Sequence, residues 1–390
     1  MFMEIMNKAK AVISFVVIVF SVIMFSVIST GIWGGKPEKV QSNAELIMNS
    51  EMTIAEFGQK NQIPDKVLNK VFQIDDAKSS EKRLSEFNFD KDKLSSDINK
   101  ALAIYNEQGS KNWIKIFIKF VLWFVFLFIV FILTQKRAIT NKVRNLLYVI
   151  STVIFGIILS SDPSPMGTIK DAVVLFGINK VIFVPRLIAL VVFLLLVILA
   201  NKFICSWGCQ FGVLQDLLFR INRNNKRSKG IFRQYKPPFV VTNTIRIAFF
   251  VVFTAIAFVW ALDVVELIDP FKIYNPSVVS FFGWIFIGII LVLSLVIYRP
   301  WCHLFCPFGL VGWLFEKISL YRITVNYDTC TACQSCAKAC PSTVMDAILK
   351  QEKVIPDCFA CSSCLNVCPS NSVGFRFGKR NKPPEGFFGK

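Results

Sequence analysis

The sequence predicts an all-α polytopic membrane bundle of about six transmembrane helices with an internal repeat, followed by a small α+β domain. Of the 390 residues, 54% are hydrophobic and 39 are Phe, and they occur in long runs that soluble proteins lack. The loops between these runs alternate in charge. All 12 Cys lie at or after Cys205, and most of them form two identical frames close to the C-terminus.

The net charge of +18 would suit a protein that binds nucleic acid, but the distribution of the charge argues against that partner. Basic residues are concentrated in short loops, as the positive-inside rule requires of a membrane protein. His303 is the single His, which excludes a haem held by two His, and there is no C-x-x-C-H attachment site. Electron carriers in this chain must therefore be ligated by sulfur.

Residues 1–35 are predicted to form an N-terminal transmembrane helix. The stretch 11–35 is uncharged and follows Lys8 and Lys10, so its start is expected in the cytoplasm. A cleaved signal peptide is the alternative, although the apolar stretch is long for one and no A-x-A site follows it. Both interpretations place the next segment outside the cytoplasm.

Residues 36–112 are predicted to form a small helical extracytoplasmic domain. The segment holds 12 Lys or Arg and 13 Asp or Glu, and it contains no Cys. Thr53 and Glu56 fit a capping box that precedes apolar residues at helical spacing. Docking of a partner and a simple connecting role are both compatible with this composition.

Five further spans are predicted after this domain, and the loops between them set their direction. Residues 135–145 carry basic residues only, and residues 201–241 carry eight basic residues and one Asp. By contrast, residues 263–280 carry three acidic residues and one Lys. This alternation predicts a multi-pass protein of the bacterial cytoplasmic (inner) membrane, with both chain ends and the C-terminal domain in the cytoplasm. The expected spans are 113–134, 146–161, 183–203, 245–262 and 281–298.

Residues 146–240 and 241–320 are predicted to be two copies of one membrane unit, preceded by a helix and a cytoplasmic loop at 113–145. The stretch Cys205–Gly212, with its second thiol at Cys209, aligns without a gap on Cys302–Gly309, with its second thiol at Cys306. We expect each pair of thiols to lie on one face of a helix at the cytoplasmic surface, ahead of an amphipathic stretch. We also expect the two membrane units to be related by an axis along the membrane normal. The four thiols could bind a third iron–sulfur or other metal centre, cycle as redox dithiols, hold a structural metal or be simply buried.

The segment 321–378 carries the most specific motif. A C-x-x-C-x-x-C-x-x-x-C-P frame begins at Cys330 and recurs at Cys358. This is the spacing of bacterial ferredoxins with two [4Fe–4S] clusters, in which the fourth Cys of each frame ligates the other cluster. Paired Zn sites are the alternative, but they prefer two C-x-x-C pairs without a third Cys in phase. We therefore predict an α+β ferredoxin domain followed by a basic tail at 379–390, with cluster I on Cys330, Cys333, Cys336 and Cys368, and cluster II on Cys340, Cys358, Cys361 and Cys364.

Charged residues within or beside the spans have two interpretations. Arg186 and Arg246 lie near the ends of their spans and are expected to snorkel to the membrane interface, although a quinone or cluster role is the alternative. The acidic residues at the outer edge are expected to form a solvated rim, although a quinol site there would need such proton acceptors. These residues are Asp162, Asp263, Glu266 and Asp269.

Over about residues 146–378, the two C-x-x-x-C pairs together with the two ferredoxin frames resemble the membrane polyferredoxins of anaerobic respiration, the NapH, NosR and MauN type. The resemblance implies two [4Fe–4S] clusters on the cytoplasmic face and electron exchange with quinone or quinol, or with a periplasmic or cytoplasmic redox protein. Two departures are present. Residues 36–112 lack the Ser/Thr-Gly-Ala-Thr site for covalent flavin, and Gln210 stands where the motif has Pro.

The leading hypothesis is therefore a membrane-bound electron-transfer protein of a quinol dehydrogenase-like system, which contacts membrane lipid and does not bind nucleic acid. An assembly factor that uses its clusters to reduce a metal or thiol on a client protein is a second hypothesis, and a redox sensor is a third. Steady turnover with a quinone analogue would distinguish the first hypothesis from the other two.

Overall fold

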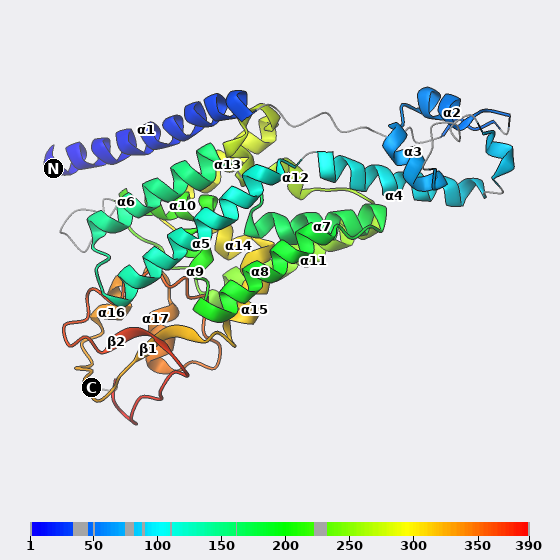
Figure 1. The fold of residues 1–390 in the computed structure, drawn as a ribbon. Coiled ribbons are helices and arrows are strands. Elements are labelled where there is room, and N and C mark those ends of the chain that lie inside the picture. The colour runs from blue at the N-terminus through cyan, green and yellow to red at the C-terminus, as the bar shows by residue number, and fades with distance from the viewer. Residues whose placement is uncertain are drawn as a thin grey trace.

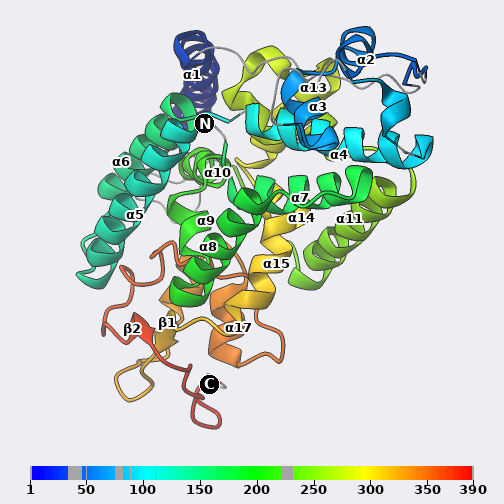
Figure 2. The ribbon, with the colours of Figure 1, turned by 45° about the vertical axis from the view of Figure 1, so that its right-hand side comes forward.

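The computed structural model describes residues 2–33, 46–49, 51–74, 82–87, 90–109, 111–160, 162–221 and 232–388. Figure 1 shows a bundle of helices with a small helical domain at one end and a two-stranded sheet at the opposite end. Figure 2 shows the same arrangement after rotation, so the two small domains lie at opposite ends of the bundle.

Four helices among the described residues are long and apolar enough to cross a membrane, which makes this a membrane protein. They are α1 (Phe2–Trp33), α5 (Trp113–Gln135), α6 (Asn141–Ser151) with its π-helical continuation η3 (Thr152–Ile158), and α11 (Phe239–Val259). The other two expected spans are the shorter apolar helices α8 (Val184–Ala200) and α13 (Phe281–Leu293).

Each short helix is followed by a helical hairpin that turns back into the bundle. The first hairpin consists of α9 (Phe203–Trp207) and α10 (Gln210–Ile221), and the second consists of α14 (Pro300–Leu304) and α15 (Pro307–Glu316). The turn of the first hairpin lies beside the middle of α5, where Gly208 O accepts a hydrogen bond of 3.0 Å from Trp123 Nε1. At its other end α10 reaches the C-terminal domain, where Arg220 Nη2 donates to Ser363 Oγ at 3.1 Å.

The hairpins are buried more deeply than their sequence pattern indicates. The amphipathic stretch that follows Cys209 is buried along Gln210–Phe219, because α1, α6 and η3 pack around it. The four thiols of the repeat are buried as well, and their location at the cytoplasmic end of the bundle stays a prediction. A sequence repeat cannot distinguish a helix that ends at the surface from one that folds back into the bundle.

Short helices cover the end of the bundle that faces the small helical domain. The helix α7 (Pro165–Asn179) packs on α8, α11 and α15. The connection from α11 to α13 forms α12 (Val265–Ile268), η4 (Pro270–Tyr274) and η5 (Pro276–Val278). Tyr274 of η4 packs against Gly156 of η3, where an added Cβ would lie 2.4 Å from the Tyr ring.

The small helical domain has a hydrophobic core of its own, which includes Phe57 and Ile98. It consists of α2 (Ile54–Asn61), α3 (Asp65–Phe72), η2 (Leu84–Glu86) and α4 (Lys91–Gly109). The capping box predicted at Thr53 and Glu56 is present at the start of α2. Part of the predicted segment 36–112 lies outside the described residues.

The C-terminal domain packs directly on the bundle. Its elements are β1 (Tyr321–Val325), α16 (Ser335–Ala339), α17 (Val344–Lys350) and β2 (Val373–Phe377), and the strands pair antiparallel with Ile323 opposite Phe375. Arg137, in the loop after α5, donates hydrogen bonds to the backbone carbonyls of Leu365 and Asn371 at 3.1 and 2.8 Å. The domain is therefore held to the bundle by specific polar contacts.

Candidate metal centres

The first candidate centre is a cavity in the C-terminal domain. The backbone is left-handed at Ala332 and Gln334, with φ of 54° at both residues, and these turns bring thiols three positions apart to one side of the chain. The cavity is lined by the thiols Cys330, Cys333, Cys336 and Cys368, together with Leu349, Val373 and Phe388 among its apolar residues.

The second candidate centre is a cavity built from the second frame. Left-handed residues recur there at Ala360 and Ser362, with φ of 49° and 61°. Cys340 is the C-cap residue of α16 and directly precedes Pro341, and its thiol does not line the first cavity. The thiols that line the second cavity are Cys340, Cys358, Cys361 and Cys364. The structure thus brings together the crossed sets that the spacing predicts, and ligation of clusters by these sets stays a prediction.

The thiols in these cavities fit the chemistry of iron–sulfur clusters, which are held by four thiolates and transfer single electrons when bound. Burial raises the pKa of the Cys336 thiol to about 11 and also raises the pKa of Cys340. Cluster binding must therefore displace protons from these thiols. Among the described residues, no three His, Cys, Asp or Glu side chains gather closely enough to hold one bare metal ion, and the eight thiols instead stand around the two cavities.

The interior thiols of the two hairpins form a third group. Cys205 lies in α9 and Cys302 in α14, whereas Cys209 and Cys306 lie where the next helix begins. All four are buried, and each interacts electrostatically with a thiol of the other hairpin. The expectation that each pair shares one face of a helix is wrong, because α9 ends at Trp207, before Cys209, and α14 ends at Leu304, before Cys306.

A cation from one half of the repeat holds the hairpin of the other half. Arg299 Nη1 donates to Cys205 O at 2.6 Å, and Lys202 Nζ donates to Gly309 O at 2.6 Å. Lys202 precedes Cys205 by three positions, and Arg299 precedes Cys302 by the same number. Each of these two aligned cations therefore binds the backbone of the other hairpin, and the two contacts hold the pairs of thiols beside each other.

The two hairpins need Gly at the repeated Phe-Gly position. A Cβ at Gly212 would lie 2.9 Å from Cys205 O, and a Cβ at Gly309 would lie 2.5 Å from Cys302 O. Real Cβ atoms do not approach a backbone oxygen so closely, so Gly permits the two helices of each hairpin to pack together. The backbone N–H of Gly309 also donates to Cys306 Sγ, at 3.4 Å.

A buried ionic contact connects the second cavity with the bundle. Asp357, which precedes Cys358, accepts hydrogen bonds from Lys202 Nζ at 2.5 Å and from Arg246 Nη1 at 2.7 Å. Burial alone would raise the pKa of Asp357, but Arg246 and Lys202 lower it to about 2. Arg246 is fully buried in this contact, which corrects the expectation that it snorkels to the interface.

Family models match the segments that carry all three groups of thiols. A "4Fe-4S dicluster domain" matches residues 322–369, which contain the eight thiols of both cavities. A "4Fe-4S binding domain" matches residues 182–229 and 279–323, which contain the two hairpins. The chain is therefore an iron–sulfur protein.

Curated relatives agree with these matches. The chain is 26% identical to the "Putative electron transport protein YccM" of Escherichia coli over 40% of this chain and 46% of YccM. It is 26% identical to the "Ferredoxin-type protein NapH" of Haemophilus influenzae over 39% of this chain and 52% of NapH. The two relatives and the family models support a similarity to the NapH-type membrane polyferredoxins.

The matched part of this chain spans about half the length of those two relatives. A longer match is an uncharacterised protein of Methanocaldococcus jannaschii, which is 24% identical over 54% of this chain and 77% of its own length. No solved structure matches the chain.

Two buried carboxylates of the chain were missed by reasoning from sequence. Asp357 was overlooked beside the Cys frame, and Asp216 was counted only as the one acid in a basic loop. Asp216 accepts hydrogen bonds from Arg299 Nη2 at 2.8 Å and from the hydroxyl groups of Tyr148 and Tyr298, both at 2.9 Å. A lone acid among eight basic residues was the signal that could have identified it.

Proposed function

We propose that the polyferredoxin is an electron-transfer protein that moves electrons between a redox partner in the membrane and one at its C-terminal domain. The two adjacent cavities, each lined by four thiols, carry this proposal. Cluster I is assigned to Cys330, Cys333, Cys336 and Cys368, and cluster II to Cys340, Cys358, Cys361 and Cys364.

The four interior thiols are proposed to hold a third iron–sulfur or other metal centre. Their burial, the contacts between the hairpins and the match of both hairpin segments to a 4Fe-4S binding domain support this assignment. Four thiolates are the ligand set of an iron–sulfur cluster. The residues are Cys205, Cys209, Cys302 and Cys306.

The partners are proposed from the location of the centres. Quinone or quinol is the partner on the membrane side, and a cytoplasmic redox protein docks near Cys333, an exposed thiol of the C-terminal domain. The loop charges support an orientation with both chain ends and the C-terminal domain in the cytoplasm. The small helical domain then faces the periplasm.

Matched substitutions test the assignment of the two clusters. Cys336→Ser and Cys340→Ser remove thiols of the same sequence frame, yet the crossed assignment predicts that they damage different clusters. Iron content and EPR spectra of the dithionite-reduced, anaerobically purified protein report the result. Loss of the same EPR signal in both variants would overturn the crossed assignment.

Single Cys→Ser variants at the four interior positions test the third centre. If these thiols act as one unit, each variant loses the same iron or metal content and the same electron transfer with quinone, while the EPR signals of clusters I and II remain. Independent buried thiols would instead give small losses of stability that differ from site to site. Wild-type metal content and turnover in two or more variants would refute the third centre.

A further inference from the structure

A wide polar cavity lies where the loop between α5 and α6 meets the C-terminal domain. Its volume is about 580 Å³, and its walls come mainly from that loop, the start of α6, the end of α10 and residues 363–371. Arg137, Arg144 and Arg220 line it, whereas no Asp or Glu among the described residues does so. We propose that this cavity binds a phosphate group, carried by an anionic phospholipid or by a soluble phosphate compound, which is a ligand separate from the proposed redox partners.

The guanidinium group of Arg144 is buried but has donors without partners. Arg144 is only 2% exposed. Its Nη1 donates to Asn141 Oδ1 at 3.1 Å, but its Nε and Nη2 have no hydrogen-bond partner among the described residues. None of the ion pairs between described residues includes Arg144. A buried, unpaired cation is unfavourable, and the oxygens of a phosphate match the planar donors of an Arg side chain.

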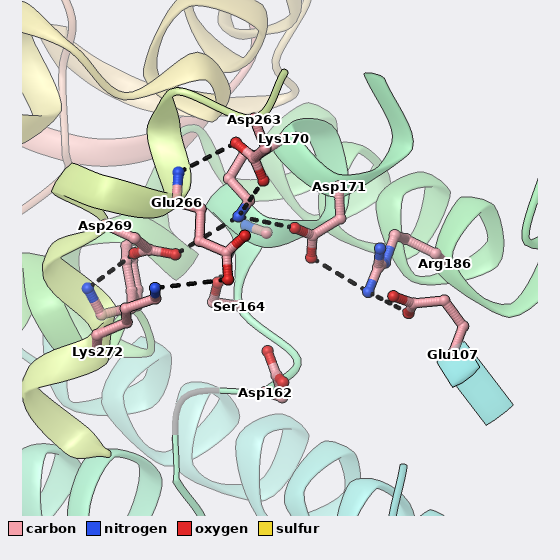
Figure 3. A network of polar contacts seen from close by, with 12 residues as sticks. Glu107, Asp162, Ser164, Lys170, Asp171, Arg186, Asp263, Glu266, Asp269 and Lys272 are labelled. Carbon is pink, nitrogen blue, oxygen red and sulfur yellow. Dashed lines mark hydrogen bonds and ion pairs between the residues drawn. The ribbon is translucent and has the colours of Figure 1, made fainter. Parts of the chain in front are cut away.

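Two buried cations at the opposite end of the bundle show what Arg144 lacks. Figure 3 shows Lys170 and Arg186 among carboxylates of neighbouring segments. Lys170 Nζ lies 3.1 Å from Asp171, and Arg186 Nη2 lies 2.8 Å from Glu107. The protein thus supplies a carboxylate to each of these cations but leaves Arg144 without one, which is the arrangement expected where an external anion binds.

The other Arg side chains of the cavity add to its positive charge. Arg220 Nε lies 2.7 Å from Asp216, but the same carboxylate also accepts a hydrogen bond from Arg299 at 2.8 Å. Arg137 donates to uncharged groups of the C-terminal domain, among them Asn371 Oδ1 at 2.8 Å. A single carboxylate is therefore shared by two cations, and the charges of Arg137 and Arg144 are left over for a ligand.

The start of α6 supplies a second feature that favours an anion. Thr140 is the N-cap residue of this 11-residue helix, and its Oγ1 accepts a hydrogen bond from the backbone N–H of Val143. Both Thr140 and Asn141 line the cavity. The positive end of the helix dipole therefore lies at the cavity wall, where it stabilises negative charge.

The cavity lies at the level expected for phospholipid head groups. The membrane-crossing helix α5 ends at Gln135, and the next one, α6 with η3, begins at Asn141. Leu146 is 59% exposed, so α6 presents apolar surface to lipid chains close to the cavity. Basic pockets at such helix ends bind anionic lipid head groups. Asn141 and Asn371 are exposed as well, so a soluble phosphate compound can also enter.

A phosphate in this cavity would contact both the membrane bundle and the C-terminal domain. Arg220, at the end of α10, donates to Ser363 Oγ of the C-terminal domain at 3.1 Å, and both residues line the cavity. A ligand held between these walls stabilises the packing of one domain on the other. Binding should therefore raise the unfolding midpoint of the protein in proportion to ligand concentration and affinity.

Three probes, added separately to the delipidated full-length protein in detergent, test the inference. They are dioleoyl phosphatidylglycerol, inorganic phosphate and dioleoylglycerol, which has the same acyl chains as the first probe but no phosphate. Native mass spectrometry counts bound probe, and thermal unfolding measures the shift of the midpoint. One copy of phosphatidylglycerol or of phosphate should bind and raise the midpoint, whereas dioleoylglycerol should do neither.

Substitutions of Arg144 connect the binding to the cavity. Arg144→Gln should weaken binding of the phosphate probe about tenfold, and Arg144→Lys, which keeps the charge, should weaken it less. The matched control Lys142→Gln removes the same charge from an exposed residue that does not line the cavity, so it should bind as the wild type does. Val367→Trp, which narrows the cavity from its exposed wall, is a second variant that should also weaken binding.

The midpoint without probe separates a binding role from a structural one. Because Arg144 has few partners to lose, Arg144→Gln should unfold close to the wild type when no probe is present. Binding of phosphatidylglycerol alone would identify a lipid as the source of the phosphate, and binding of inorganic phosphate alone would identify a soluble compound. Failure of both probes to bind, equal binding by Arg144→Gln and the wild type, or equal losses in Arg144→Gln and Lys142→Gln would overturn the inference.

Discussion

Replacing Asp357 by Asn tests how the ferredoxin domain is held to the membrane bundle. The Asp357 carboxylate is fully buried and lies 2.5 Å from Lys202 Nζ and 2.7 Å from Arg246 Nη1, and both cations are also fully buried. The substitution preserves the size of the side chain but removes its charge. Two buried cations then lose their counter-ion, and breaking such a contact costs about 3–5 kcal/mol.

That loss is a large share of the typical stability of a folded domain, which is about 5–15 kcal/mol. Thermal unfolding in detergent, followed together with the EPR signal of cluster II, measures the effect. Asp346→Asn is the matched control, because Asp346 pairs with Lys350 at 2.9 Å on an exposed helix turn. A solvent-exposed pair of this kind contributes little to stability, so Asp346→Asn should unfold close to the wild type.

A second substitution tests the cause of the loss. Lys202→Met in the Asp357→Asn background removes one of the uncompensated charges and should recover part of the stability. Equal, small shifts for Asp357→Asn and Asp346→Asn, or no recovery in the double variant, would refute the view that a buried ionic contact joins the two domains.

Packing, pH and topology give three more predictions. Gly309→Ala should lower the unfolding midpoint, because its methyl group would lie 2.5 Å from Cys302 O and such overpacking costs about 1–3 kcal/mol. The control Gly288→Ala places its methyl group in open space and should leave the midpoint unchanged. Burial raises the pKa of Asp269 to about 6, and the unfolded value is about 3.9. The folded state therefore binds more protons between these values, so stability should rise as the pH falls from about 7 to 5, and Asp269→Asn should flatten this rise. A Cys that replaces the exposed Lys60 should react with a membrane-impermeant maleimide in spheroplasts, whereas one that replaces Lys142 should react only after lysis. Equal midpoints for the two Gly variants, an unchanged pH profile or reversed labelling would contradict the respective prediction.

Local patterns in the sequence predicted the features that depend on neighbouring residues. The capping box at Thr53 follows from residues three positions apart, and the long apolar helices follow from composition. The two Cys frames selected the thiols that line each cavity, because a tight turn fixes where thiols three positions apart can point.

Features that depend on contacts between distant segments could not be predicted. The sequence showed Lys202, Arg246 and Asp357 as separate charges, and Arg246 was misread as a residue that reaches the membrane interface. The partners lie 155 and 111 positions apart along the chain. Only the folded bundle shows that they neutralise one another.

The sequence by itself determined that this is a membrane protein rich in paired thiols, because apolar run length, loop charge and Cys spacing are local properties. The tertiary structure alone decided that the repeated hairpins turn back into the bundle and bury their four thiols there. It also decided that Arg186 is buried between the carboxylates of Glu107 and Asp171. The physical reason is that burial and pairing of a charge depend on which distant segments pack around it, and a single sequence does not record that packing.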